Sequence, residues 1–152
     1  MSGEGGSGRL VWTVGHSDRR PEELVALLAS HGIARVVDVR SHPWSRRHPW
    51  HGRTELERSV RDGGIRYTWL GAALGGMRPE GFRAHQRSDA YQRGLEELIR
   101  LAREDVSAVL CAERDPSHCH RRFIADDLAR SGLVVRHLLG PDEIVPHQPS
   151  FL

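Results

Sequence analysis

The chain has 152 residues, which is enough for one domain with its own core and too few for two ordinary domains. Hydrophobic residues make up 38% and charged residues 28%, a balance that excludes disorder of the whole chain. The formal net charge is only +2, and all 22 basic residues are Arg, whose planar fork grips phosphate or carboxylate with two hydrogen bonds.

The sequence also argues against a membrane protein. Its apolar runs are far shorter than the roughly 18 residues of a membrane span, and its first residues lack the charged and then apolar layout of a signal peptide. We therefore expect a cytoplasmic protein that does not associate with membranes. In a reducing compartment, its two cysteines are expected to be thiols, metal ligands or a transient redox pair rather than a structural disulfide.

The composition divides the chain into three parts. Residues 1–8 are rich in Gly and Ser and predict a flexible tail, residues 9–140 form one domain, and residues 141–152, with three prolines, are expected to be an extended C-terminal tail. Within the domain, short apolar runs predict strands over 10–14, 33–39, 65–70, 106–111 and 133–138.

Four helices are predicted between these strands. Helical spacing starts at Pro21, at Thr54 with Glu57 completing a capping box, at Asp89 as a cap, and at the Asp115-Pro116 pair. The Gly-rich residues 71–88 show no clear period, and so long an irregular connection is more often functional than accidental.

The alternation of strands and helices predicts an α/β fold. We expect a single domain with a mainly parallel sheet of about five strands and helices on both faces. Ligands of such sheets bind beyond the carboxyl ends of the strands. Gly15-His16-Ser17, Arg40 with its loop, the Gly-rich connection and Cys111-Ala112-Glu113 all follow predicted strands, so they are expected at one edge of the sheet.

The candidate site residues fall into two groups by chemistry. The candidate catalytic residues exchange protons or act as nucleophiles: His16, Cys111, Glu113, Cys119 and His120. The candidate anion-binding residues are Ser17, Arg40, Arg46, Arg47 and Arg121. Each has a structural alternative, because cysteines also pack as small apolar residues, Glu113 also suits an ion pair, and His16-Ser17 also suits a helix cap.

Cys119, His120 and Arg121 are expected in the first turn of the last helix. The free backbone N–H groups and the helix dipole favour an anion there. The same field lowers the pKa of a thiol, which makes Cys119 a candidate thiolate.

Known cysteine signatures narrow the chemistry. A Cys-x5-Arg phosphate loop would need Arg at 117 or 125, where the sequence has Ser117 and Ala125, so phosphatase and rhodanese-like sites are disfavoured. Metal ligands and cofactors are not assigned. Zinc remains an alternative because its ligand types are present at Cys111, His118, Cys119 and His120, although paired Cys-x2-Cys spacing is missing.

Residues 40–53 combine four Arg, three His and two Trp with no acidic residue. Guanidinium and indole groups bind phosphate and stack on bases. The candidate partners are therefore a small anionic substrate or a nucleic acid, and the oligomeric state is not predicted.

Five motifs resemble a known family. They are Thr13–Ser17, Val37–Arg40 followed by Pro43–Arg47, Leu74–Gly76, Cys111–Glu113, and Cys119–Arg121 with Ile124-Ala125. In this order they resemble the bacterial and archaeal family labelled domain of unknown function 488, over roughly Val11 to Leu138. The resemblance supports the location of the site, and it implies no particular reaction because the family's activity is unassigned.

Three functions remain open from the sequence. The first is an enzyme that binds a phosphate-bearing or otherwise anionic substrate, such as a nucleotide or nucleic acid, in a Cys/His/Glu/Arg cleft. The second is a nucleic-acid-binding module without catalysis, whose affinity falls steeply with salt. The third is a thiol redox or sensor protein, which requires Cys111 and Cys119 to lie within disulfide range.

Overall fold

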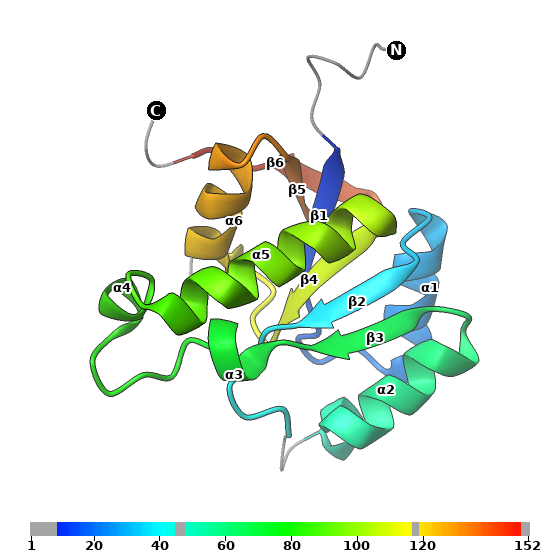
Figure 1. The fold of residues 1–152 in the computed structure, drawn as a ribbon. Helices are drawn as coiled ribbons and strands as arrows, with labels where there is room; N and C mark the ends of the chain where they lie inside the picture. The colour runs from blue at the N-terminus through cyan, green and yellow to red at the C-terminus, as the bar shows by residue number, and fades with distance from the viewer. Residues whose placement is uncertain (1–8, 45–47, 117–118, 150–152) are drawn as a thin grey trace.

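A six-stranded sheet forms the centre of the computed structural model, which describes residues 9–44, 48–116 and 119–149 (Figure 1). The strand order is β3-β2-β4-β1-β5-β6. The strands are β1 (Leu10–Gly15), β2 (Arg35–Asp38), β3 (Arg66–Trp69), β4 (Ser107–Cys111), β5 (Val134–Gly140) and β6 (Glu143–Pro146). All neighbours pair in parallel except β6, which runs antiparallel to β5.

Helices cover both faces of the sheet, which confirms the predicted α/β class (Figure 1). They are α1 (Pro21–Ser30), η2 (Pro49–His51), α2 (Arg53–Asp62), α3 (Gly71–Leu74), α4 (Phe82–His85), α5 (Asp89–Glu104) and α6 (Arg121–Arg130). One core lies under α5 and α6, where Leu98 and Ile124 pack with Val109 of β4. The other lies under α1 and α2, where Leu24 and Val60 pack with Leu110.

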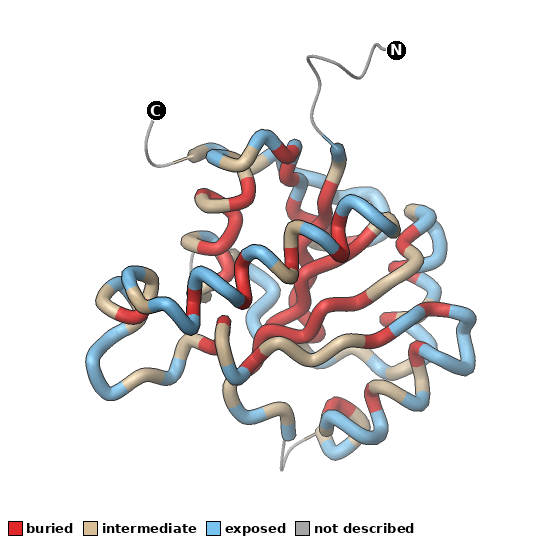
Figure 2. Tube along the Cα trace, in the orientation of Figure 1, coloured by how far each residue is buried: buried red, intermediate tan, exposed pale blue. Residues whose placement is uncertain are grey.

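Successive residues of β4 therefore point into different cores, and the whole strand is buried (Figure 2). Burial on both faces explains its continuous apolar run, because a strand covered on both sides needs no polar alternation. Burying each such Val or Leu side chain contributes roughly 1.5–3 kcal/mol relative to leaving it in water.

Several element boundaries differ from the sequence predictions. The predicted Thr54–Glu57 capping box is wrong, because α2 begins at Arg53 with Gly52 as its N-cap and without a side-chain cap, and Glu57 pairs with Arg61 at 2.8 Å. The cap of α5 is Ser88 rather than Asp89, and its Oγ accepts a hydrogen bond from the backbone N–H of Tyr91.

The connection over residues 71–88 is not wholly irregular, since it contains the short helices α3 and α4. The last helix begins later than Asp115-Pro116 predicts. Its first residue is Arg121 and its N-cap is His120, so Cys119 and His120 precede the helix instead of lying in its first turn.

The segment expected as a C-terminal tail contains β6. A chain of hydrogen bonds holds the residue that follows β6, His147. Its Nδ1 lies 2.9 Å from His137 Nε2, and its Nε2 lies 2.7 Å from Asp126 Oδ1. The other ring nitrogen of His137, Nδ1, lies 2.6 Å from Thr13 Oγ1. Burial and the neighbouring His147 lower the pKa of His137 to about 4, so this imidazole is neutral at physiological pH. All four residues of β6 are exposed, so apolar burial contributes little to holding this strand. The polar side chains of the hydrogen-bonded chain therefore help to attach it to the domain.

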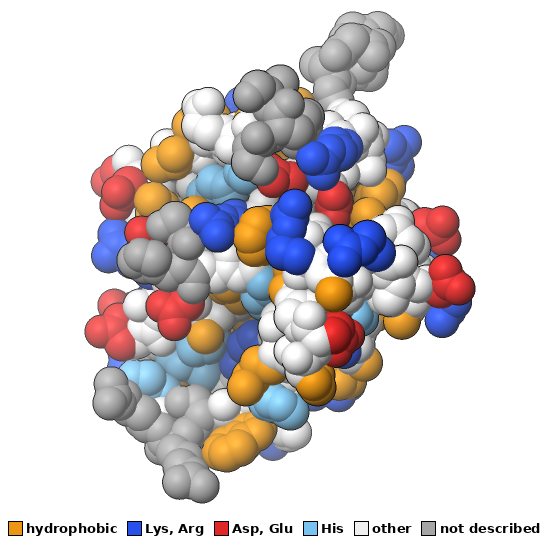
Figure 3. All heavy atoms as spheres, turned by 90° about the vertical axis from the view of Figure 1, so that its left-hand side faces the viewer, with side chains coloured by type: hydrophobic (Ala, Val, Ile, Leu, Met, Phe, Trp, Pro, Cys, Tyr) orange, Lys and Arg blue, Asp and Glu red, His pale blue; other side chains and the backbone are white. Residues whose placement is uncertain are grey.

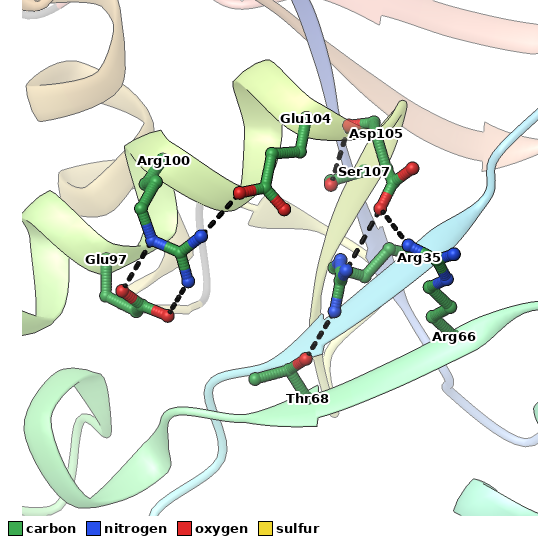
Figure 4. A network of polar contacts seen from close by, with 8 residues as sticks. All are labelled: Arg35, Arg66, Thr68, Glu97, Arg100, Glu104, Asp105 and Ser107. Carbon is green, nitrogen blue, oxygen red and sulfur yellow. Dashed lines mark hydrogen bonds and ion pairs between the residues drawn. The ribbon is translucent and has the colours of Figure 1, made fainter.

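A polar network joins the amino-terminal ends of β2, β3 and β4, at the edge opposite the carboxyl ends (Figure 4). Arg35 donates to Thr68 at 2.8 Å and to Asp105 at 2.9 Å, and Asp105 also accepts from Arg66. Arg35 and Arg66 lower the pKa of Asp105, with the Arg35 hydrogen bond as the main cause. The Asp105 carboxylate thus links two guanidinium groups from neighbouring strands, which suits a structural role for this edge.

Candidate active site at the carboxyl edge

The site forms where the connections from neighbouring strands go to opposite faces of the sheet. β4 lies between β1 and β2; the chain leaves β1 and β2 toward α1 and α2, and it leaves β4 toward α6 on the other face. Such a reversal opens a crevice beyond the strand ends, the usual ligand position in this class of sheet. Gly15 allows a close approach here, because a Cβ at this position would overlap the carbonyl of Glu113.

A cavity of about 450 Å³ occupies this crevice, and we call it the site cavity. Its lining comes from the ends of β1, β2 and β4, the loop after α3 and the residues before α6: His16, Arg40, Ser41, His42, Trp44, Gly76, Met77, Cys111, Ala112, Glu113, Cys119 and His120. All five candidate catalytic residues therefore meet around one space. Loops distant in sequence supply its walls.

The candidate anion-binding residues are placed less uniformly. Arg40 lines the site cavity, whereas Ser17 lines an adjoining hollow of about 480 Å³ that shares His16 and Glu113 with it. Arg121 is completely buried beside the sulfur of Cys111. Arg46 and Arg47 lie outside the described residues.

The two cysteines form a sulfur pair at the wall of the site cavity. Their Sγ atoms lie 2.7 Å apart, and both residues are free thiols. Cys111 is only 1% exposed, whereas Cys119 is half-buried, so Cys119 is the sulfur that a ligand meets first. The condition set for a thiol redox pair, that the two cysteines lie within disulfide range, is met by this separation.

The two sulfurs differ in acidity. A hydrogen bond from the Cys111 thiol lowers the pKa of Cys119 to about 4 from an ordinary value near 9, with His120 and the backbone N–H of Arg121 acting in the same direction. Burial raises the pKa of Cys111 well above the ordinary value, and the anion beside it adds to the effect. At neutral pH the pair therefore consists of a Cys119 thiolate that accepts a hydrogen bond from a Cys111 thiol.

The guanidinium of Arg121 lies beside the sulfur pair and donates to backbone carbonyls rather than to a carboxylate. It donates to the carbonyls of Glu113 and Arg114, both at 2.9 Å, and approaches Cys111 Sγ at 3.2 Å. Within the described part of the chain it forms no ion pair with Asp or Glu. A buried cation requires a counter-charge, and the neighbouring thiolate supplies one.

His120 links the thiolate to the opposite wall. Its Nδ1 lies 3.5 Å from Cys119 Sγ, and its Nε2 lies 3.2 Å from the carbonyl of Val39. Because a carbonyl only accepts, Nε2 carries a proton, and Nδ1, which faces the sulfur, donates to the thiolate when the ring is doubly protonated. Gly76 packs against this ring, since a Cβ there would lie 2.7 Å from the His120 Cγ and Nδ1 atoms. A larger residue at Gly76 would therefore collide with the His120 ring, which explains the glycine at this position.

His16 is arranged as a neutral base. Its Nδ1 donates to the carbonyl of Ser17 at 2.9 Å, which leaves the Nε2 lone pair unprotonated. Burial lowers the pKa of His16 to about 3, and His51, whose tilted ring has its centroid 4.0 Å from that of His16, acts in the same direction. Ser17 holds this turn in the left-handed region at φ 52°, a conformation that is uncommon for a residue with a side chain.

Arg40 is already occupied by a buried partner. Its Nε and Nη2 donate to the two carboxylate oxygens of Asp38 at 2.9 and 2.8 Å, and its Nη1 donates to the carbonyl of His51. Tyr67 donates to the same carboxylate, and burial and Asp38 raise its pKa above the ordinary range. This bidentate fork positions the loop after β2, and it leaves Arg40 less able to grip a ligand than the sequence suggested.

Asp38, Tyr67 and His51 were not among the sequence candidates. Asp38 precedes Arg40 by two residues, the spacing that brings both side chains to one face at the end of a strand, and this was an available signal. Tyr67 and His51 reach Asp38 and Arg40 only through the tertiary fold.

The zinc alternative receives no support from the geometry. Among residues 9–44, 48–116 and 119–149, no three His, Cys, Asp or Glu side chains are grouped so that they could hold a metal ion. His118, one of the four ligands considered, lies outside the described residues.

The fold and this site together define an α/β domain with a thiol pair at the topological reversal of its parallel sheet. The family model described as Domain of unknown function DUF488 matches residues 20–128, more than half of the chain, so the protein belongs to that family. Comparison with curated proteins found no match, and comparison with solved structures found none either. Of the helices in the described segments, none has the length and apolar character needed to span a bilayer.

Proposed function

We propose that this protein is an enzyme that binds an anionic, phosphate-bearing substrate in the site cavity and attacks it with the Cys119 thiolate. The observation that carries the proposal is the sulfur pair: a half-buried thiolate lines a cavity large enough for a small ligand, with a thiol 2.7 Å away that stabilises its charge. Depressed thiol pKa values occur where a cysteine acts as a nucleophile.

Two other residues of the cavity, His16 and Glu113, are placed to orient water and to exchange protons. His16 presents an unprotonated Nε2, because its Nδ1 proton is donated to Ser17 and its pKa is lowered by burial. Glu113 places an exposed carboxylate on the same lining. His16 accepts a hydrogen bond from a second nucleophile such as water and orients it, and Glu113 exchanges a proton at the solvent side.

Two guanidinium groups at the carboxyl ends of the strands are bonded to carbonyls rather than to carboxylates, and they support an anionic substrate. Arg19 donates to the carbonyls of Gly15 and Leu139, as Arg121 does to those of Glu113 and Arg114, and the described residues form no carboxylate ion pair with either guanidinium. Burial and the neighbouring Arg114 lower the pKa of Arg19, as expected where cations crowd. The thiolate offsets one of these two charges, and the remaining positive charge near this edge of the sheet favours an anionic ligand.

Two exposed apolar side chains lie at the rim of the site cavity. Trp44 and Met77 line it and are 61% and 70% exposed, so a substrate meets an indole and a thioether at the entrance. By contrast, the face that carries α4 and α6 mixes basic and acidic side chains (Figure 3). Anion recognition is therefore assigned to the cavity rather than to this outer face.

Two alkylating reagents test the proposal without knowledge of the substrate. Iodoacetamide is neutral and iodoacetate is anionic, and both alkylate thiolates. We expect both to label Cys119 rather than Cys111, and the iodoacetate-to-iodoacetamide rate ratio to be several-fold higher on the protein than on 2-mercaptoethanol. Added salt should reduce this preference.

Cys119→Ser is the matched control and should abolish labelling of the folded protein. Labelling that persists in this variant would remove Cys119 as the nucleophile. A rate ratio equal to that of the reference thiol would remove the anionic substrate and leave the nucleophile in place.

A further inference from the structure

We infer that Cys119 and Cys111 form a reversible intramolecular disulfide when a hydroperoxide oxidises Cys119, so that the site carries its own redox modification. This rests on the Cys119 thiolate that the proposed function also uses, and it requires no particular substrate. Cys111 acts here as a resolving cysteine, a role distinct from its hydrogen bond to the thiolate.

The geometry needs little change to make the bond. A covalent S–S bond is about 2.05 Å long, so the sulfurs at 2.7 Å need to approach by only about 0.7 Å. Cys111 closes the rigid, fully buried strand β4, and Cys119 precedes α6 in the loop that returns to the end of this strand. The two sulfurs therefore start in contact without refolding of the sheet.

The exposure of the two sulfurs indicates which cysteine is oxidised first. Cys119 lines the site cavity and is half-buried, whereas Cys111 is 1% exposed and lies behind it. A hydroperoxide that enters the cavity therefore meets Cys119 first. Arg121 Nη1, 3.2 Å from Cys111 Sγ, stabilises the negative charge that develops on that sulfur when its proton leaves.

The atoms and electrons balance in two steps. The Cys119 thiolate attacks the terminal oxygen of the hydroperoxide; the S–O bond forms, the O–O bond breaks, and the alkoxide leaves as an alcohol with a proton from solvent. Cys119 is then a sulfenic acid. The Cys111 sulfur attacks the Cys119 sulfur; the S–S bond forms, the S–O bond breaks, and the leaving hydroxide takes the Cys111 proton as water. A small dithiol returns both thiols by exchange.

Intact-mass measurement after treatment with stoichiometric hydrogen peroxide tests the inference. The mass of the wild-type protein should fall by two hydrogens, and neither cysteine should then titrate as a free thiol. Dithiothreitol should restore the original mass and both thiols. Cys111→Ser, which keeps a hydroxyl donor beside Cys119, should instead gain one oxygen and become labelled by dimedone. Cys119→Ser should remain unmodified, because Cys111 is buried and protonated.

Two outcomes would overturn the inference: wild-type protein that gains oxygen without losing hydrogens, or Cys119→Ser protein that consumes peroxide at the wild-type rate. Cys111→Ala provides a second variant if the serine disturbs the strand, and circular dichroism verifies the fold of each. If Cys119 alkylates rapidly but the disulfide never forms, the inference fails while the proposed function stands. If Cys119 neither alkylates nor oxidises, both fail.

Discussion

At the scale of single residues, the difference between the two cysteines follows from their neighbours. Cys119 faces a thiol, the ring of His120 and a backbone N–H, and each of them lowers its pKa. Cys111 is enclosed in the core beneath α6, where water cannot solvate a charge. The same residue type therefore has opposite pKa shifts eight positions apart.

The lowered pKa predicts how alkylation of Cys119 depends on pH. Because the folded-state pKa is about 4, the thiolate is fully formed above that pH and is lost as the pH falls through it. The rate with iodoacetamide should thus stay within about twofold between about pH 6 and pH 8, where an ordinary thiol changes on the order of 80-fold. Peptide mapping by mass spectrometry gives the rate, and an ordinary steep profile would contradict the assignment.

The buried Asp38–Arg40 pair predicts a stability effect. Asp38→Asn leaves a guanidinium that is only 7% exposed without its counter-charge, so the free energy of unfolding should fall by about 3 kcal/mol. Urea denaturation measures the change. Glu55→Gln is the matched control: it breaks an ion pair with Arg58 whose side chains are 51% and 63% exposed, and it should change stability by at most about 0.5 kcal/mol. Equal effects in the two variants would contradict a structural role for Arg40.

At the scale of elements, the start of α6 explains where the anion lies. The helix was expected to present a free amino-terminal end to a ligand. Instead, the backbone N–H of Arg121 points to Cys119 Sγ at 3.4 Å, so the anion at this helix end is the protein's own thiolate. A substrate anion must then use other positive groups of the site.

The loop after α3 predicts a test of His120. In Gly76→Ala the new methyl would lie 2.7 Å from the imidazole and would displace it from Cys119. The pKa of Cys119 should rise, so alkylation with iodoacetamide at about pH 5 should slow relative to alkylation at about pH 8. Gly140→Ala is the control, because its nearest neighbour would lie at an ordinary 3.7 Å. An unchanged profile in Gly76→Ala would remove His120 from the support of the thiolate.

At the scale of the whole molecule, one sheet is shared by both cores. Every described strand pairs with a neighbour, and alternate residues of the central strands contribute to the two cores, so neither core can be lost alone. We predict one cooperative unfolding transition in urea. Far-ultraviolet circular dichroism and tryptophan fluorescence should give coincident curves, and two separated transitions would show independent units.

Local patterns identified much of the fold. The fourth strand was predicted over 106–111 and lies at Ser107–Cys111, because a fully buried strand is continuously apolar. β6 was not predicted as a strand, because its exposed residues carry no alternating pattern and its position depends on pairing with β5 and on His147. The start of α6 was placed too early, because Asp115-Pro116 resembles a helix start and the later position depends on contacts of Cys119 and Arg121.

The sequence by itself determined the fold class and the edge of the sheet that carries the candidate residues, since periodicity and strand ends are properties of neighbouring residues. Only the tertiary structure decided which of those residues touch. It brought Cys111 and Cys119 into contact, placed the guanidinium of Arg40 against the carbonyl of His51 and buried Arg121 beside the sulfurs. The physical reason is that these contacts depend on how the loops after β2 and β4 fold back at the carboxyl edge, and this packing leaves no periodic pattern in the sequence.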